Sequence, residues 1–254
     1  MEPEESELVD RLLSNTLSMT GASRVRKIRE LDQLLFDNPE FVDSRFRPED
    51  YGKDQYKVAI FGQPKLGKKW MFRLQGHHLS VNVTLSGNNI ISSTPQFFGE
   101  YPRISHLRGQ EAAARRLAIH LHSRGALGAD LGAPLPRRIL LLPGENNVAV
   151  LPSGIRYSAL EPQEREKFNL IVAYFIETLS PSEQTRMAAR FTEAKLRTPD
   201  ELHFRWMGHF SPGSPVHFLI QLRPGVGITL EHQNLDGQHV HSVLRDFDND
   251  FGGR

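Results

Sequence analysis

Two pairs of histidines are the side chains of this sequence best suited to chemistry. His239 and His241 stand two residues apart in GQHVHSVLRD, and His77 and His78 lie about 160 residues earlier in GHHLSVN. In a β-strand, alternate side chains project to the same face, so His239 and His241 present two imidazoles to one surface. The sequence has no cysteine, so a metal site must be built from imidazole and carboxylate ligands.

The residues after His78 decide how the upstream pair contributes. In a regular strand, His78 is in phase with a polar stripe that includes Asn82, whereas His77 is in phase with apolar residues. If this polar stripe faces the same cleft as His239 and His241, the three histidines form one site. His77 then either replaces His78 as a ligand or supports the site from behind. We expect Asn82 to orient a ligand or a substrate.

A carboxylate is predicted beside the downstream pair. The link NLDG has Asn first and Gly fourth, the composition of a type I turn closed by a left-handed glycine in a three-residue hairpin. In that register Gln233 pairs with His239 and Glu231 pairs with His241, so Glu231 becomes a fourth ligand or a general base. A two-residue turn would present His232 in place of Glu231.

The C-terminal strand also offers charged groups. Arg245 follows the histidines and either anchors a substrate carboxylate or pairs internally with Asp246. Asp246, Asp248 and Asp250 alternate as in a calcium loop, but the glycine comes one residue late, which favours a solvated acidic turn.

A third motif, GQPKLGK at residues 62–68, has the spacing of a phosphate-binding loop. Lys69 follows where Ser or Thr should meet magnesium, and a strand-like run replaces the required helix. We therefore expect a basic hairpin turn.

Helices and strands alternate in blocks around these motifs. Two apolar periodicities near 3.6 at residues 5–37, divided at Gly21, predict N-terminal helices. Short β-rich runs from Tyr56 onward predict a meander of antiparallel strands.

The second half repeats this alternation. Helices are predicted at 110–124 and 162–179 and again after Ser180, where Glu183 completes a capping box. Strands return after Pro199. This order indicates an α+β fold in which the two β-rich regions form one antiparallel sheet with helices packed on it.

Composition limits the function classes. The 254 residues include 39% hydrophobic residues, and 31 basic against 30 acidic residues leave a net charge of +1. This balance disfavours nucleic acid as the partner. No apolar run approaches a membrane span, and the acidic N-terminus is unlike a signal peptide, so we expect a cytoplasmic protein without a membrane partner. We expect a single domain over residues 1–254, with a helical segment at 1–40 and an α+β core at 56–252.

Several segments of the sequence are similar to those of one protein family. YKVAIFGQP, GHHLSVN, STPQFFGEYP, GIRYSALEPQEREKF and HVHSVLRDFDNDFG resemble the bacterial family catalogued as domain of unknown function 3500. The resemblance covers roughly residues 56–252, and the two histidine segments are its most specific parts. It implies that the histidine pairs form one site, and it implies no reaction.

These observations predict a metal-dependent enzyme. We expect one divalent transition metal ion, with copper or iron favoured and zinc possible, held by His78, His239 and His241. An oxidoreductase or oxygenase acting on a small molecule or a modified amino acid fits such a site best. A zinc-dependent hydrolase and a non-catalytic binding or scaffold protein are the alternatives, and the oligomeric state is left open.

Overall fold

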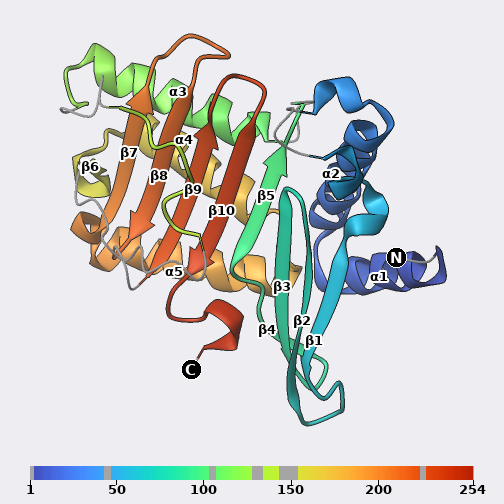
Figure 1. Ribbon diagram of the computed structural model, residues 1–254. Coiled ribbons are helices and arrows are strands. Elements are labelled where there is room, and N and C mark those ends of the chain that lie inside the picture. Colours follow the sequence, from blue (N-terminus) through green and yellow to red (C-terminus); the bar gives the residue numbers. More distant parts are fainter. Residues whose placement is uncertain are drawn as a thin grey trace.

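One antiparallel sheet runs through the whole molecule (Figure 1). The computed structural model describes residues 3–42, 47–102, 107–127, 134–142, 154–223 and 227–253. The strand order is β1-β2-β3-β5-β10-β9-β8-β7-β6, and β4 pairs with β3 outside this path. The strands are β1 (Lys57–Gly62), β2 (Lys69–Gly76), β3 (Leu79–Ser86), β4 (Asn89–Ser92), β5 (Gln96–Glu100), β6 (Ile155–Arg156), β7 (Leu202–Gly208), β8 (Val216–Leu222), β9 (Ile228–Asn234) and β10 (Val240–Asp246).

The two β-rich regions of the sequence meet where β5 pairs with β10. His241 lies opposite Gly99 in this pairing, and Val243 lies opposite Phe97. The predicted α+β fold with a shared antiparallel sheet is therefore confirmed. The GQPKLGK segment links β1 to β2, which pair as an antiparallel hairpin, as predicted.

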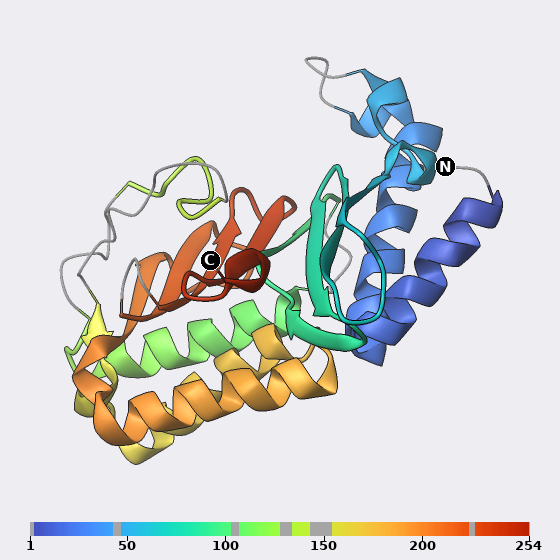
Figure 2. The same ribbon diagram turned by 90° about the horizontal axis from the view of Figure 1, so that it is seen from below.

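Helices cover one face of the sheet in two groups (Figure 2). The helices are α1 (Pro3–Thr16), α2 (Met19–Asp37), α3 (Arg108–Ser123), α4 (Pro162–Ile176) and α5 (Pro181–Arg197). Helices α1 and α2 pack on β2 and β3 in one hydrophobic core, and α3, α4 and α5 pack on β7, β8 and β9 in a second core. Burial of these apolar surfaces is the main stabilising contribution to the fold. None of the described helices is both long enough and apolar enough to cross a membrane.

The N-terminal helices divide earlier than predicted. Ser18 caps α2, and its side chain accepts a hydrogen bond from the Gly21 amide at 2.9 Å. Gly21 therefore lies inside the first turn of α2 and does not separate the helices. A Cβ at this position would lie 2.1 Å from the Thr178 carbonyl oxygen, so glycine is required by close packing on the chain after α4.

The capping box lies on α4, and the one predicted on α5 is incomplete. The Glu164 carboxylate accepts from the Glu161 amide at 2.8 Å, and the Glu161 side chain accepts from the Glu164 amide. Ser180 caps α5 as predicted, but the Glu183 carboxylate accepts from the Ser93 amide and from Arg186. The Glu183 carboxylate therefore connects α5 to the segment before β5, and it does not cap the Ser180 amide of its own helix.

The opposite face of the sheet carries no α-helix among the described elements. Residues 134–142 and the C-terminal turn lie over it (Figure 2). The candidate site lies on this face.

Candidate metal centre

His77 and His78 lie in a tight turn between β2 and β3. Gly76 pairs with Leu79, which leaves only these two histidines in the link, and His78 has a positive φ of 57°. The two rings lie 3.8 Å apart between centroids. The prediction that a regular strand would send the two histidines to opposite faces is therefore wrong, because the strand begins only at Leu79.

Gly99 makes room for the His78 ring. The Gly99 amide donates to the His78 carbonyl oxygen at 2.7 Å, which places the two residues opposite each other between β3 and β5. A Cβ on Gly99 would lie 2.6 Å from His78 Cδ2. The glycine thus lets the imidazole lie flat across β5 toward β10.

The two histidine pairs converge, as the sequence analysis expected. His78 Nε2 lies 2.8 Å from His239 Nε2. One nitrogen from each of His78, His239 and His241 lies within 4.8 Å of the other two. Two nitrogen ligands held about 2.1 Å from one metal ion at a right angle lie about 3.0 Å apart. The spacing of these three side chains therefore fits a shared metal ion.

Burial keeps the three imidazoles neutral. It lowers the pKa of His78 well below its ordinary value, and the neighbouring imidazoles lower it further. Burial, followed by proximity to His239 and His77, lowers the pKa of His241 to about 3. Burial also lowers the pKa of His239. Neutral imidazole is the form that ligates metal ions, so the cluster is prepared for a cation.

A buried carboxylate holds His77 in place. His77 Nδ1 lies 2.6 Å from Asp32 Oδ1 on α2, and Asp32 is 1% exposed. Burial raises the pKa of Asp32 despite the contact with His77. Tyr51 packs edge-on against the His77 ring at 4.6 Å. Asp32 was missed by the sequence analysis because it falls within an ordinary amphipathic helix.

The four histidines line one cavity of about 730 Å³. Aromatic and apolar residues complete the walls, among them Tyr51, Tyr101, Phe97 and Leu35. Asp236 reaches the rim, where its carboxylate accepts from the His239 amide at 2.7 Å. The cavity is large enough for a small organic molecule beside the imidazoles.

The structure does not bring Glu231 to the cluster. In the observed register His241 lies opposite Gln233, and Val243 lies opposite Glu231. Glu231 faces the same side of the sheet as His241, as predicted, but it is displaced along the strand by two residues. The hairpin centres one residue later than predicted, because the Leu235 amide bonds to the His239 carbonyl oxygen.

Glu231 instead fixes a covering segment. Its carboxylate accepts from the amides of Leu140 and Leu141 at 2.7 and 3.0 Å, and His217 Nε2 lies 2.7 Å from it. The alternative residue His232 lies on the other face, 3.3 Å from the Glu111 carboxylate. Glu231, predicted as a fourth ligand or a general base, therefore stabilises the fold and does not reach the histidine cluster.

Arg245 also lies away from the cluster. Its Nε donates to Asp250 Oδ2 at 2.7 Å, and Nη1 donates to the Leu141 carbonyl oxygen at 3.3 Å. Its partner is Asp250 and not the expected Asp246. Asn82 does lie on the His78 face, where it accepts from Arg73 Nε at 2.6 Å.

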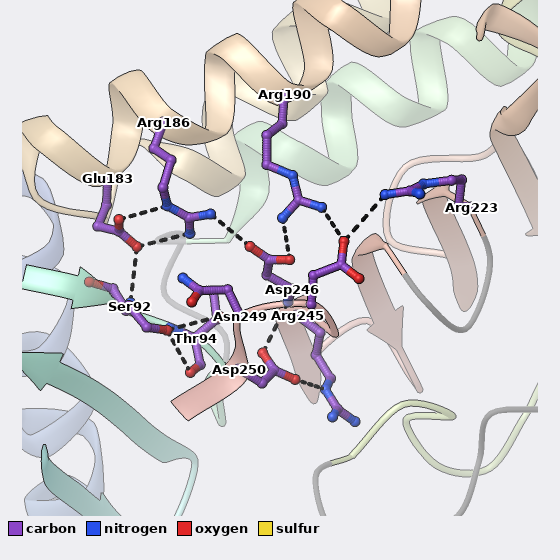
Figure 3. Close-up of polar contacts among 12 residues, drawn as sticks. Ser92, Thr94, Glu183, Arg186, Arg190, Arg223, Arg245, Asp246, Asn249 and Asp250 are labelled. Carbon is purple, nitrogen blue, oxygen red and sulfur yellow. Dashed lines mark hydrogen bonds and ion pairs between the residues drawn. The ribbon is translucent and has the colours of Figure 1, made fainter. Parts of the chain in front are cut away.

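The acidic C-terminal residues are paired with arginines (Figure 3). Arg186 and Arg190 of α5 both bind the carboxylate of Asp246, which is fully buried. Asp248 binds Arg190 at 2.6 Å. The prediction of a solvated acidic turn is wrong for Asp246, because two arginines one helical turn apart reach it.

Comparisons with known proteins support one assignment. None of the curated proteins and none of the solved structures matches the chain. The family model described as "Protein of unknown function (DUF3500)" matches residues 1–253, so the match includes the N-terminal helices as well as the expected core. The chain belongs to the DUF3500 family.

Proposed function

We propose that this protein is a cytoplasmic, metal-dependent oxidoreductase that acts on a small molecule. One observation carries the proposal: three neutral imidazoles, from a turn and from a strand about 160 residues later, converge within 4.8 Å in a cavity. One N–H···N hydrogen bond between His78 and His239, at 2.8 Å, offsets only part of the cost of burying three imidazoles. Binding of one metal ion supplies the remaining stabilisation.

The ligand set favours copper(II). Non-haem iron(II) sites usually combine two histidines with a carboxylate. Among the described residues, the group of His78, His239 and His241 holds no carboxylate; Asp32 forms a separate group with His77 and His78, and its Oδ1 is engaged by His77. Three imidazoles with open coordination positions suit copper, which supplies one-electron chemistry when bound.

The surrounding residues have separate tasks in this proposal. Tyr51 and Tyr101 bound the space in which a substrate lies. His77 is fixed through Nδ1 by Asp32, so its Nε2 is the remaining ring nitrogen for proton exchange in the cavity. Glu231 has no part in the chemistry.

A zinc-dependent hydrolase is the second candidate. Three histidines without a carboxylate are also a catalytic zinc set, in which the ion lowers the pKa of a bound water. The Asp32–His77 pair would then accept the proton of that water. Metal identity and oxygen dependence distinguish this function from the first.

Metal analysis tests the proposal directly. Purified protein is stripped with chelator, titrated with copper(II), iron(II) or zinc, and compared with the variants His78→Ala, His239→Ala and His241→Ala. We expect one equivalent of bound metal, copper(II) resonance signals from nitrogen ligands, and loss of both in each variant. His209→Ala is the matched control, since His209 is exposed and lies outside the cluster.

Binding well below one equivalent, or binding that survives all three substitutions, contradicts the proposal and supports a scaffold role. Stoichiometric zinc without oxygen consumption in a substrate screen supports the hydrolase.

A further inference from the structure

A second cavity adjoins the histidine pocket on the same face of the sheet. Its volume is about 680 Å³, and Gly76 and Phe97 line both cavities. Ser80 and Asn82 of β3 also line it, and both share the face of Phe97 and His241, because Ser80 pairs with Phe97 and Gly99 pairs with His241. A ligand in the second cavity therefore reaches the histidines by passing Phe97.

The second cavity is cationic. Lys57 of β1 and Arg73 of β2 line it, and its described lining includes no aspartate or glutamate. The amides of Gln55 and Gln75 add further hydrogen-bonding groups. A cleft lined by one sign of charge concentrates ions of the opposite sign, so the expected ligand is an anion.

Arg73 is held in position to bind a carboxylate. Its Nε donates to Asn82 Oδ1 at 2.6 Å, and Asn82 is itself fixed because its Nδ2 donates to the Pro95 carbonyl oxygen at 2.8 Å. Asn82 is 2% exposed. Among the residues that the structure describes, no carboxylate pairs with Arg73. With Nε engaged, Nη1 and Nη2 remain to bind two carboxylate oxygens.

Apolar groups surround this arginine. Its guanidinium carbon lies 5.7 Å from the Phe61 ring centroid and 5.5 Å from the Phe251 ring centroid. Leu79, Pro95, Phe97 and Leu142 add apolar surface to the cavity wall. The combination of one fixed cation with apolar walls matches an organic acid better than a phosphate ion.

We propose that the second cavity binds the carboxylate of an elongated organic acid whose other end reaches the histidine cluster. This assignment of substrate class rests on the proposed metal-dependent function. His78 directly precedes β3 and Asn82 is the fourth residue of that strand, so their Cα atoms lie at most about 13 Å apart. The acid therefore carries an apolar chain of comparable length between its carboxylate and its reacting end.

Calorimetry on chelator-treated protein tests the carboxylate site without metal. Octanoate is the probe, and 1-octanol is its uncharged analogue. We expect Arg73→Gln to weaken octanoate binding at least tenfold, Arg73→Lys to weaken it less, and octanol binding to change little. The control is Arg197→Gln on α5, because this arginine is 78% exposed and far from the cavity in sequence. Equal octanoate affinity in wild type and both Arg73 variants overturns the site.

Copper resonance spectra test the link to the histidines. Decanoate spans the two cavities and should alter the copper(II) signal of loaded wild type, whereas acetate, and decanoate with Arg73→Gln, should leave it unchanged. An unaltered signal at saturating decanoate overturns the assignment as substrate. If the protein binds no copper, the proposed function fails, and the metal-free calorimetry still decides whether the carboxylate site exists.

Discussion

Hydrogen-bond partners separate the clustered histidines from the other buried ones. His217 and His232 are fully buried, and Nε2 of each ring contacts a carboxylate, that of Glu231 and that of Glu111 respectively. The rings of the His78, His239 and His241 cluster have no carboxylate partner among the described residues and contact one another. Residue type and burial alone do not distinguish these groups. The partner does, and it identifies the cluster as the candidate for a cation.

Metal should stabilise the protein only through this cluster. A ligand selective for the native state adds about 2.7 kcal/mol at a hundredfold excess over its dissociation constant, which is a rise of roughly 5 to 10 °C in melting temperature for a chain of this size. Replacing His239 and His241 together by alanine should abolish the rise. In chelator the double variant and wild type should melt at nearly the same temperature, because the two hydrophobic cores do not involve these residues.

Thermal melts with chelator, copper(II) and zinc measure this, with His209→Ala as control. A double variant that is unfolded in chelator would show that the histidines are required for the fold.

Acidity should destabilise the metal-free protein through the same side chains. A histidine in the unfolded chain titrates near 6.5, whereas His241 in the folded protein titrates near 3. Between these values the unfolded state binds the extra proton, so the free energy of unfolding falls as pH decreases, by up to about 1.4 kcal/mol per pH unit for one such group. Above pH 6.5 this contribution is constant.

Urea unfolding at pH 7.5, 6 and 5 should therefore show a steeper loss in wild type than in His241→Gln. Parallel pH dependence in the two proteins would exclude His241 as the cause.

Among the secondary-structure elements, two turns between strands bring the histidines together. The β2–β3 turn supplies His77 and His78, and the β9–β10 hairpin supplies His239. Strand β5 lies between β3 and β10 and carries Gly99 at the contact. A strand with a side chain at this position would separate the histidine pairs, so the glycine in β5 is part of the site.

Gly99→Ala should therefore weaken metal binding. The new Cβ lies 2.6 Å from His78 Cδ2, so the ring must move away from His239, and overpacking of this kind costs about 1–3 kcal/mol of stability. Gly109→Ala is a matched control, because its Cβ would lie 2.7 Å from the Tyr174 ring of α4, within the helix layer and not against His78. Copper titration of both variants should show at least a tenfold loss of affinity for Gly99→Ala alone. Unchanged affinity would mean that His78 can move without disturbing the site.

At the scale of the whole molecule, a charged network joins the helix layer to both halves of the sheet (Figure 3). Glu183 of α5 accepts from the Ser93 amide before β5, and Arg186 bridges Glu183 to Asp246 at the end of β10. Removing one member of a buried ion pair leaves its partner uncompensated, which is strongly destabilising. The network thus fixes β5 and β10 against the same helix, and these two strands frame the site.

Asp246→Asn should lower the free energy of unfolding by about 3 kcal/mol, since two partly buried arginines lose their shared carboxylate. Glu193→Gln removes an exposed pair with Arg197 and should cost less than about 1 kcal/mol. Urea unfolding of both variants with wild type provides the measurement. A small effect for Asp246→Asn would show that solvent replaces the ion pairs.

Local sequence patterns predict the α+β class, the sharing of one sheet by two β-rich regions, and the projection of His239 and His241 to one face. These features follow from local periodicity, because side-chain alternation and helix periodicity repeat within a few residues. The choice of ligands among eleven histidines also came from local spacing and from resemblance to the family.

Local patterns do not predict which polar groups meet across elements, and these contacts are seen in the folded chain. The two-residue turn at His77 and His78, the register that places Gln233 opposite His241, and the contact of Asp32 with His77 all depend on pairings between distant segments. A shift of hairpin register moves every facing residue at once, so Glu231 was assigned to the site although it faces the covering segment. The position of Arg73 could not be predicted for the same reason. Its strand is expected from the sequence, but its place beside Asn82 follows from the pairing of β2 with β3.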